Sequence, residues 1–200
     1  MSYTREQVET AVKAKGHTWF ESTKDYDVNI VGIRNSATNN QVTNKFDDWM
    51  TVSYKVDGVW QFHIWQCTTD PGVKYTREKL LSSLGVARLV PNQYRGIYQI
   101  GLHQGKYSAL VQRGGPVKVW RDANKDGIYD ETKTEEGLFG INIHRSSPTG
   151  ISTQVDGWSA GCQVFANINN FTQFMRIMEK ARETFGNKFT YTLIESKDIK

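Results

Sequence analysis

Apolar side chains recur at every second position over much of the chain. In the run 60–68, Trp60, Phe62 and Ile64 share one face while the intervening residues share the other. Such alternation is typical of a half-buried strand, and the preceding Asp57-Gly58 pair favours a hairpin turn. Further short apolar runs predict strands at 97–102, 108–113, 116–120 and 188–194. From about residue 26 onwards, the pattern therefore predicts a mostly antiparallel sheet.

Three segments have the three-and-four spacing of helices instead. Thr4, with Gln7 three residues later, forms a capping box before a short helix that Gly16 ends. A brief helix is expected after Thr76, and a longer one begins after Asn170. The apolar stripes of these two helices consist of Leu80, Leu81 and Leu84 in the first, and of Phe171, Phe174, Met175, Met178, Ala181 and Phe185, ending at Gly186, in the second.

The 200 residues contain no internal repeat and no linker-like segment, so we expect one domain spanning residues 1–200. Its fold class is α+β and mainly β, with a few short helices and one longer C-terminal helix. The net charge of +4 comes from scattered basic residues rather than a run, which argues against a nucleic-acid partner. We expect a monomer.

The ends and the apolar content of the chain bear on its location. The N-terminal residues have no apolar core of signal-peptide length, and no stretch approaches the length of a membrane span. The sequence therefore predicts synthesis in the cytoplasm without a signal peptide, and no membrane span. Only two cysteines occur, Cys67 and Cys162, and neither has the spacing of a zinc site.

The segment 140–166 carries the residues best suited to chemistry. His144 ends an apolar run that predicts a strand, and Gly161-Cys162 follows a glycine-containing loop. A thiol is a nucleophile only as the thiolate, so it needs a base and a place for the developing oxyanion. His144 can be the base, and Gly161 lets a substrate carbonyl approach the backbone beside Cys162.

Two questions stay open at the level of these residues alone. The group that orients the imidazole can be Asp156, Ser159 or a backbone carbonyl. The alternative to a catalytic pair is that Cys162 fills the core and His144 is a buried, satisfied histidine.

The same segment resembles the YkuD-type L,D-transpeptidase family, whose signature is a histidine, a loop, and then Ser/Thr-His-Gly-Cys. In that alignment His144 is the base, Ser159 the Ser/Thr, Gly161 the glycine and Cys162 the nucleophile. Ala160 replaces the second histidine of the family and Val164 replaces a polar residue, so the resemblance is to a divergent branch. It implies a mixed or antiparallel β-sandwich and cysteine acyl transfer on peptidoglycan stem peptides, with no required cofactor.

The likeness extends beyond this block to proteins of bacteriophages, through segments such as 101–112 and Thr68–Gly72. It implies a phage-encoded lytic enzyme that acts at the bacterial cell wall and either hydrolyses or exchanges a stem-peptide bond. The alternative is a catalytically inactive virion or cell-wall-binding protein that keeps the fold, which the missing second histidine allows. A papain-like protease fits less well, because its cysteine precedes its histidine.

Four further residues are candidates for binding the substrate. Arg145 can bind a carboxylate through both guanidinium nitrogens, although a surface ion pair is an equal alternative. His103 and Tyr107, in a predicted loop between strands, are candidates to line the cleft, against ordinary packing. Trp158 can form a wall of the pocket, or belong to the core.

A separate acidic segment resembles the opening of a calcium loop. Asp122, Asn124 and Asp126 alternate, Gly127 follows, and Asp130 comes later. Alternating oxygen ligands followed by glycine are typical of EF-hands, but Lys133 stands where the bidentate glutamate belongs. A structural calcium ion and an Asx turn without an ion are the two interpretations.

Overall fold

We describe the fold from a computed structural model, which covers residues 3–78, 82–130 and 132–200. In chain order its elements are α1 (Arg5–Ala14), β1 (Asn29–Arg34), η1 (Ser36–Thr38), β2 (Asp48–Val56), β3 (Val59–Thr68), η2 (Lys74–Glu78), β4 (Ala87–Leu89), β5 (Gln93–His103), β6 (Tyr107–Gln112), β7 (Val117–Arg121), β8 (Thr134–Gly137), β9 (Ile143–Arg145), β10 (Gln163–Phe165), α2 (Ile168–Phe185), β11 (Phe189–Glu195) and η3 (Ser196–Asp198).

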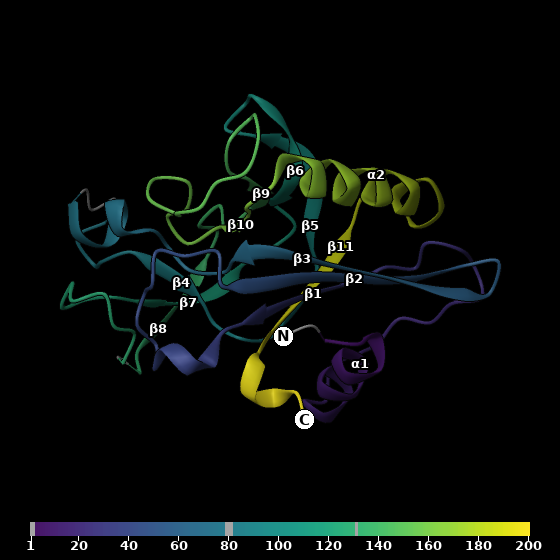
Figure 1. The fold of residues 1–200 in the computed structure, drawn as a ribbon, viewed down its shortest axis with the longest axis horizontal. Helices are drawn as coiled ribbons and strands as arrows, with labels where there is room; N and C mark the ends of the chain where they lie inside the picture. Colours follow the sequence, from purple (N-terminus) through teal and green to yellow (C-terminus); the bar gives the residue numbers. More distant parts are fainter. Residues whose placement is uncertain (1–2, 79–81, 131) are drawn as a thin grey trace.

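Eight of these strands close into a barrel with the order β1-β11-β5-β6-β9-β10-β3-β2, and β4, β7 and β8 form a separate sheet (Figure 1). Within the barrel, β1 pairs with β11 and β9 pairs with β10 in parallel, whereas the remaining pairs are antiparallel. The expected mainly β, mostly antiparallel fold is confirmed. The strands form one closed barrel rather than a sandwich, because the hydrogen-bonded ladder returns from β2 to β1 and leaves no edge.

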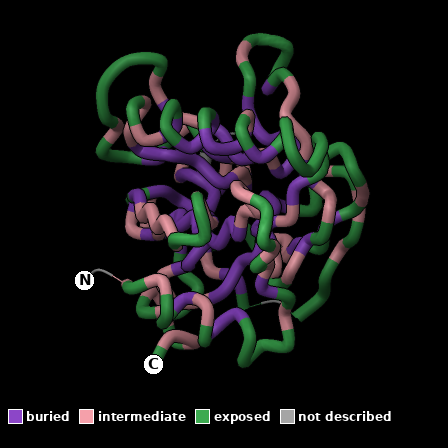
Figure 2. Tube along the Cα trace, turned by 90° about the vertical axis from the view of Figure 1, so that its right-hand side faces the viewer, coloured by how far each residue is buried: buried purple, intermediate pink, exposed green. Residues whose placement is uncertain are grey.

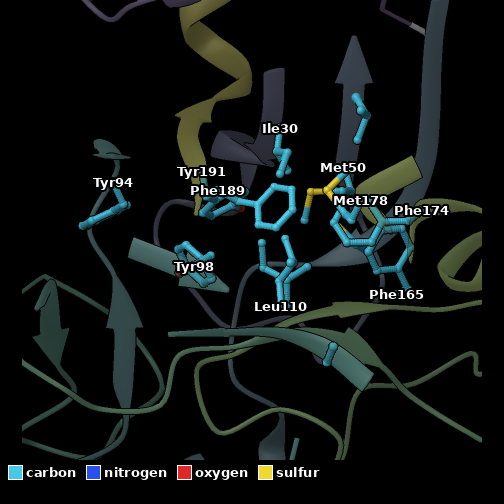
Figure 3. Close-up of a cluster of buried hydrophobic side chains, with 14 of the residues drawn as sticks. Ile30, Met50, Tyr94, Tyr98, Leu110, Phe165, Phe174, Met178, Phe189 and Tyr191 are labelled. Atoms are coloured by element: carbon cyan, nitrogen blue, oxygen red, sulfur yellow. The ribbon is translucent and has the colours of Figure 1, made fainter. Parts of the chain in front are cut away.

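The core fills the barrel and continues onto α2. Phe174 and Met178 of the helix lie against Met50 and Phe165 of the barrel strands (Figure 3). Helix α1 lies on the opposite side of the barrel from α2 (Figure 1) and packs on the outer faces of β1 and β11. The buried segments therefore occupy the middle of the molecule, with exposed loops around them (Figure 2).

The predicted helices are reproduced with shifts at their ends. The Thr4 capping box opens α1 as expected. Helix α2 begins earlier than predicted, because Asn167 and not Asn170 accepts the N-terminal hydrogen bond, from the Asn169 N–H. Gly186 ends α2 with a positive φ, but Phe185 beside it is 40% exposed rather than part of the apolar stripe.

The helix predicted after Thr76 is displaced toward the N-terminus. Thr76 lies inside the helical segment η2 rather than before it, and its hydroxyl donates to the Val73 carbonyl as a helical residue can. Leu80 and Leu81 of the predicted stripe lie outside the described residues. Leu84 is described and is exposed.

A buried ion cluster anchors the loop that follows β3. The carboxylate of Asp70 accepts hydrogen bonds from Arg88 Nε at 2.7 Å and Nη2 at 3.2 Å, and lies 3.2 Å from Arg34 Nε. Asp48 accepts from the Thr69 N–H at 2.6 Å. This cluster holds the segment 68–72, whose Gly72 N–H donates to the Ser159 carbonyl at 2.9 Å. The loop that carries Cys162 is thereby tied to a rigid charged core.

Candidate active site

The two parallel strands β9 and β10 place His144 and Cys162 on the same face of the sheet. Val164 pairs with His144 and Gln163 with Ile143, so Cys162 lies level with Asn142, two residues before the imidazole. Since strand residues two apart point to one side, Asn142, His144 and the Cys162 side chain share the face opposite the buried Ile143. The register thus places His144 on the strand that neighbours the segment of Cys162.

One ring nitrogen of His144 is fixed as a donor by its surroundings. His144 Nδ1 lies 2.7 Å from the carbonyl oxygen of Arg145, which can only accept a hydrogen bond. Nδ1 therefore carries the proton, and the lone pair of Nε2 accepts no hydrogen bond from a residue that the structure describes. Of the three orienting groups considered from the sequence, the backbone carbonyl contacts the ring. Asp156 instead bonds to Asn44.

His103 is held against His144 by a second set of contacts. The two imidazoles stack with their centroids 3.9 Å apart at 22°. Asn142 Oδ1 accepts from the Gln112 N–H, so its Nδ2 must face outward, and it donates to His103 Nδ1 at 3.0 Å. His103 is thereby fixed with its proton on Nε2, as a neutral donor.

The thiol of Cys162 lies between two backbone groups. Its sulfur accepts from the Asn142 N–H at 3.4 Å and is 3.4 Å from the Gly140 carbonyl, to which the thiol donates. In the described part of the chain, no hydrogen bond joins this sulfur to an imidazole.

Both candidate catalytic groups are uncharged at neutral pH in the free protein. Burial, followed by the neighbouring His103 ring, lowers the pKa of His144 to about 3. Burial raises the pKa of the Cys162 thiol to about 11, although the Asn142 N–H opposes this shift. The pair is therefore a thiol beside a neutral imidazole, and not a preformed thiolate–imidazolium pair.

The low pKa of His144 predicts a loss of stability in acid. The folded pKa of about 3 lies below the ordinary value of 6.5, so the stability due to this residue is present above pH 6.5 and is lost as pH falls toward 3. Asp48, whose pKa burial raises to about 7, acts in the opposite direction over this range. In urea unfolding at several pH values, His144→Gln is expected to lose less stability than wild type between pH 7 and 4. Equal losses would contradict the assignment.

Ser159 and Gly161 shape the backbone around Cys162. The Ser159 hydroxyl donates to the Cys162 carbonyl at 2.8 Å and accepts from the Gly161 N–H at 3.1 Å. Gly161 has a φ of +116°, and a Cβ there would lie 2.5 Å from the Ala87 carbonyl oxygen. The glycine is thus required for packing, and its N–H is already bonded. The Cys162 N–H, by contrast, donates to no described residue.

The predicted substrate-binding residues separate into two groups. Tyr107 lies at the site, since its hydroxyl is 3.2 Å from His144 Nδ1, and the Arg145 guanidinium lies over its ring at 4.0 Å. His103 stacks on His144 as described. Trp158 is 42% exposed, and the described ring contacts include none to the histidine pair.

The sequence did not single out Asn142, which orients His103. A signal for it was present, because Asn142 and His144 are two residues apart in a predicted strand and must share a face.

The acidic segment forms an Asx-rich turn. Asp122 accepts from the N–H groups of Asp126 and Gly127 at 3.1 and 3.0 Å, and Asp126 accepts from the Ile128 N–H. Asn124 Oδ1 also accepts from the Asp126 N–H, and Asp130 is exposed. Within the described ranges, no group of three or more His, Cys, Asp or Glu side chains is arranged to hold a metal. The oxygens of the turn thus bind backbone N–H groups.

Comparison with protein-family models, with curated proteins and with solved structures finds no match for this chain. In the part of the chain that the structure describes, no helix has both the length and the apolar character needed to cross a bilayer.

Proposed function

We propose that the protein is a cysteine enzyme that cleaves or exchanges a peptide bond of peptidoglycan stem peptides, in the manner of L,D-transpeptidases. The observation that carries the proposal is the fixed tautomer of His144, which leaves Nε2 able to accept a proton, on a strand that pairs with the strand directly after Cys162. The order of the histidine and Ser-x-Gly-Cys along the chain supports the substrate class through the family resemblance.

In this mechanism, the Cys162 thiol rotates from Gly140 toward His144 and attacks the carbonyl carbon of the scissile bond. The thiol proton moves to His144 Nε2 as the carbon–sulfur bond forms, because neither group is charged beforehand. The Arg145 carbonyl stabilises the resulting imidazolium through Nδ1–H. The imidazolium then protonates the leaving amine, and a thioester remains on Cys162.

The negative charge on the carbonyl oxygen needs donors that are in place beforehand. The Cys162 N–H has no described partner in the protein, and His103 presents a proton on Nε2 beside the catalytic ring. We assign these two groups to the oxyanion.

Water or an amine then attacks the thioester and releases Cys162. Incubation of the protein with purified muropeptides, followed by mass spectrometry, tests the proposal and separates the two outcomes. Hydrolysis yields shortened peptides, whereas exchange yields a peptide carrying the added amine. Muropeptides that remain unchanged would contradict both.

The neutral pair predicts slow chemical modification of Cys162 near pH 7. Because burial raises the pKa of the thiol to about 11, alkylation by iodoacetamide is expected to accelerate with pH until well above the ordinary cysteine pKa of about 8.5. The rate is measured by mass spectrometry of the Cys162 peptide. A rate that is already maximal at pH 7 would show a preformed thiolate and contradict the proton transfer described above.

The same buried thiol favours a second candidate function. A protein that keeps this fold as an inactive virion or cell-wall-binding component would also have an uncharged Cys162. The two candidates differ in turnover. The enzyme converts muropeptides to products, whereas the binding protein leaves them unaltered and is retained on cell walls in a pull-down.

A further inference from the structure

A groove lies beside the histidine pair, between β6 and α2. Its volume is about 570 Å³. Tyr107 and Arg145 belong to its lining. The Tyr107 hydroxyl lies near His144 Nδ1, and the Arg145 carbonyl accepts from the same nitrogen. The helix contributes an apolar wall through Phe171 and Met175. Ser108 and Thr172 also line the groove, and the Thr172 hydroxyl already donates to the Ile168 carbonyl at 2.9 Å.

The charged residues of the groove are mostly cations. Arg145, Arg176 and Lys180 line it together with one acidic residue, Glu179. Glu179 is bound to Arg182 at 2.7 Å, and Lys180 to Glu183 at 3.3 Å.

The two arginines of the lining have no such partners. Neither Arg145 nor Arg176 forms a salt bridge to any residue that the structure describes. The guanidinium group of Arg145 instead lies over the Tyr107 ring and donates from Nη1 to the Ser146 carbonyl at 3.3 Å. Two guanidinium groups beside an apolar wall suit a ligand that is partly aliphatic and carries a carboxylate.

The groove is at a suitable distance from the reacting sulfur. Cys162 lies level with Asn142, and Arg145 is three residues further along β9, which corresponds to about 10 Å along a strand. Arg145 alternates with His144 and so leaves β9 on the other face, but its guanidinium lies 4.0 Å from the centre of the Tyr107 ring, and the Tyr107 hydroxyl is 3.2 Å from His144 Nδ1. An extended peptide covers this distance with about three residues. A peptide whose carbonyl lies at Cys162 can thus place a more distant carboxylate between the two arginines.

We propose that this groove binds a free carboxylate of the stem peptide, about three residues from the attacked bond, through Arg145 and Arg176. This inference rests on the proposed function, because it takes the reacting bond to lie at Cys162. It assigns a binding role to Arg176 on α2, which lies outside the segment 140–166 that contains His144 and Cys162.

The experiment measures binding without turnover. The Cys162→Ala protein is titrated with a purified muropeptide by isothermal calorimetry, and then with the same muropeptide after chemical amidation of its carboxylates. A second protein also carries Arg176→Gln, and a control carries Arg95→Gln, which removes the same charge from the exposed Arg95 on β5 outside the groove lining. A backbone amide spectrum of each variant establishes that it is folded.

We expect Arg176→Gln to weaken muropeptide binding roughly tenfold, as the loss of a charge-assisted hydrogen bond implies. Amidation should weaken binding to the Cys162→Ala protein similarly and should have little further effect on Arg176→Gln. The Arg95→Gln control should bind as the parent does. The groove assignment is overturned if Arg176→Gln leaves the affinity for the muropeptide unchanged. It is also overturned if the Cys162→Ala protein shows no detectable binding of the muropeptide.

The turnover assay with wild type tests the proposed function separately from the groove. If wild type changes muropeptides while Arg176→Gln leaves affinity unaltered, the enzyme assignment stands and the groove is wrong. If binding depends on Arg176 but wild type produces no new products, the groove stands and the catalytic proposal is wrong.

Discussion

Cys162→Ala is expected to lower product formation from muropeptides by roughly 10⁴-fold or more, because the proposed mechanism passes through a thioester on Cys162. The effect is measured as initial rate by liquid chromatography and mass spectrometry, at a substrate concentration that saturates wild type. His144→Gln should cause a loss of similar size, since the imidazole accepts the thiol proton. The double variant should be no slower than either single variant, because each substitution alone already removes the rate enhancement that the two residues provide together.

The second cysteine provides a matched control for this experiment. Cys67 is buried in β3 and is also a free thiol. Cys67→Ala is expected to cost about 1 kcal/mol of stability through the small cavity it leaves, and to keep the wild-type rate. If Cys162→Ala forms products as fast as Cys67→Ala does, Cys162 is not the nucleophile, and the enzymatic proposal fails.

Asp70→Asn is expected to lower the free energy of unfolding by about 3–5 kcal/mol. Arg34 and Arg88 are 1% exposed, and both contact the Asp70 carboxylate. Burial alone would raise the pKa of Asp70, but the two guanidinium groups outweigh it and hold the pKa below its ordinary value. The neutral amide takes from two buried cations the carboxylate that contacts both of them and leaves Asp48 as the remaining acidic group of the cluster, which is far more costly than losing a surface ion pair.

Urea unfolding at pH 7 measures this loss, and a surface pair supplies the comparison. Glu183 forms an ion pair with Lys180, and both side chains are more than half exposed, so Glu183→Gln should change stability by no more than about 0.5 kcal/mol. Similar small changes for both variants would show that the cluster is not a major source of stability. Because the cluster anchors the loop that bonds to Ser159, Asp70→Asn should also reduce activity before global unfolding.

The positions of single elements were largely predictable from local sequence. The Thr4 and Gln7 capping box and the alternation in 60–68 depend only on residues close in the chain, and both appear as α1 and β3. The start of α2 was missed because three asparagines, Asn167, Asn169 and Asn170, stand close together, and the sequence does not show which side chain accepts from an N–H at the start of the helix. Phe185 follows the helical spacing, yet it is 40% exposed at the last turn of the helix.

The sequence by itself determined the strand-rich class, the ends of α1, and the position of a histidine and a cysteine in one short block. Only the tertiary structure decided that the sheet closes into a barrel, because β1 meets β11 from the far end of the chain. It alone also decided the state of the histidine pair, where His103 on β5 stacks on His144 and takes its proton position from Asn142. Alternation and capping act between neighbours, whereas stacking, burial and pKa depend on which distant segments come together.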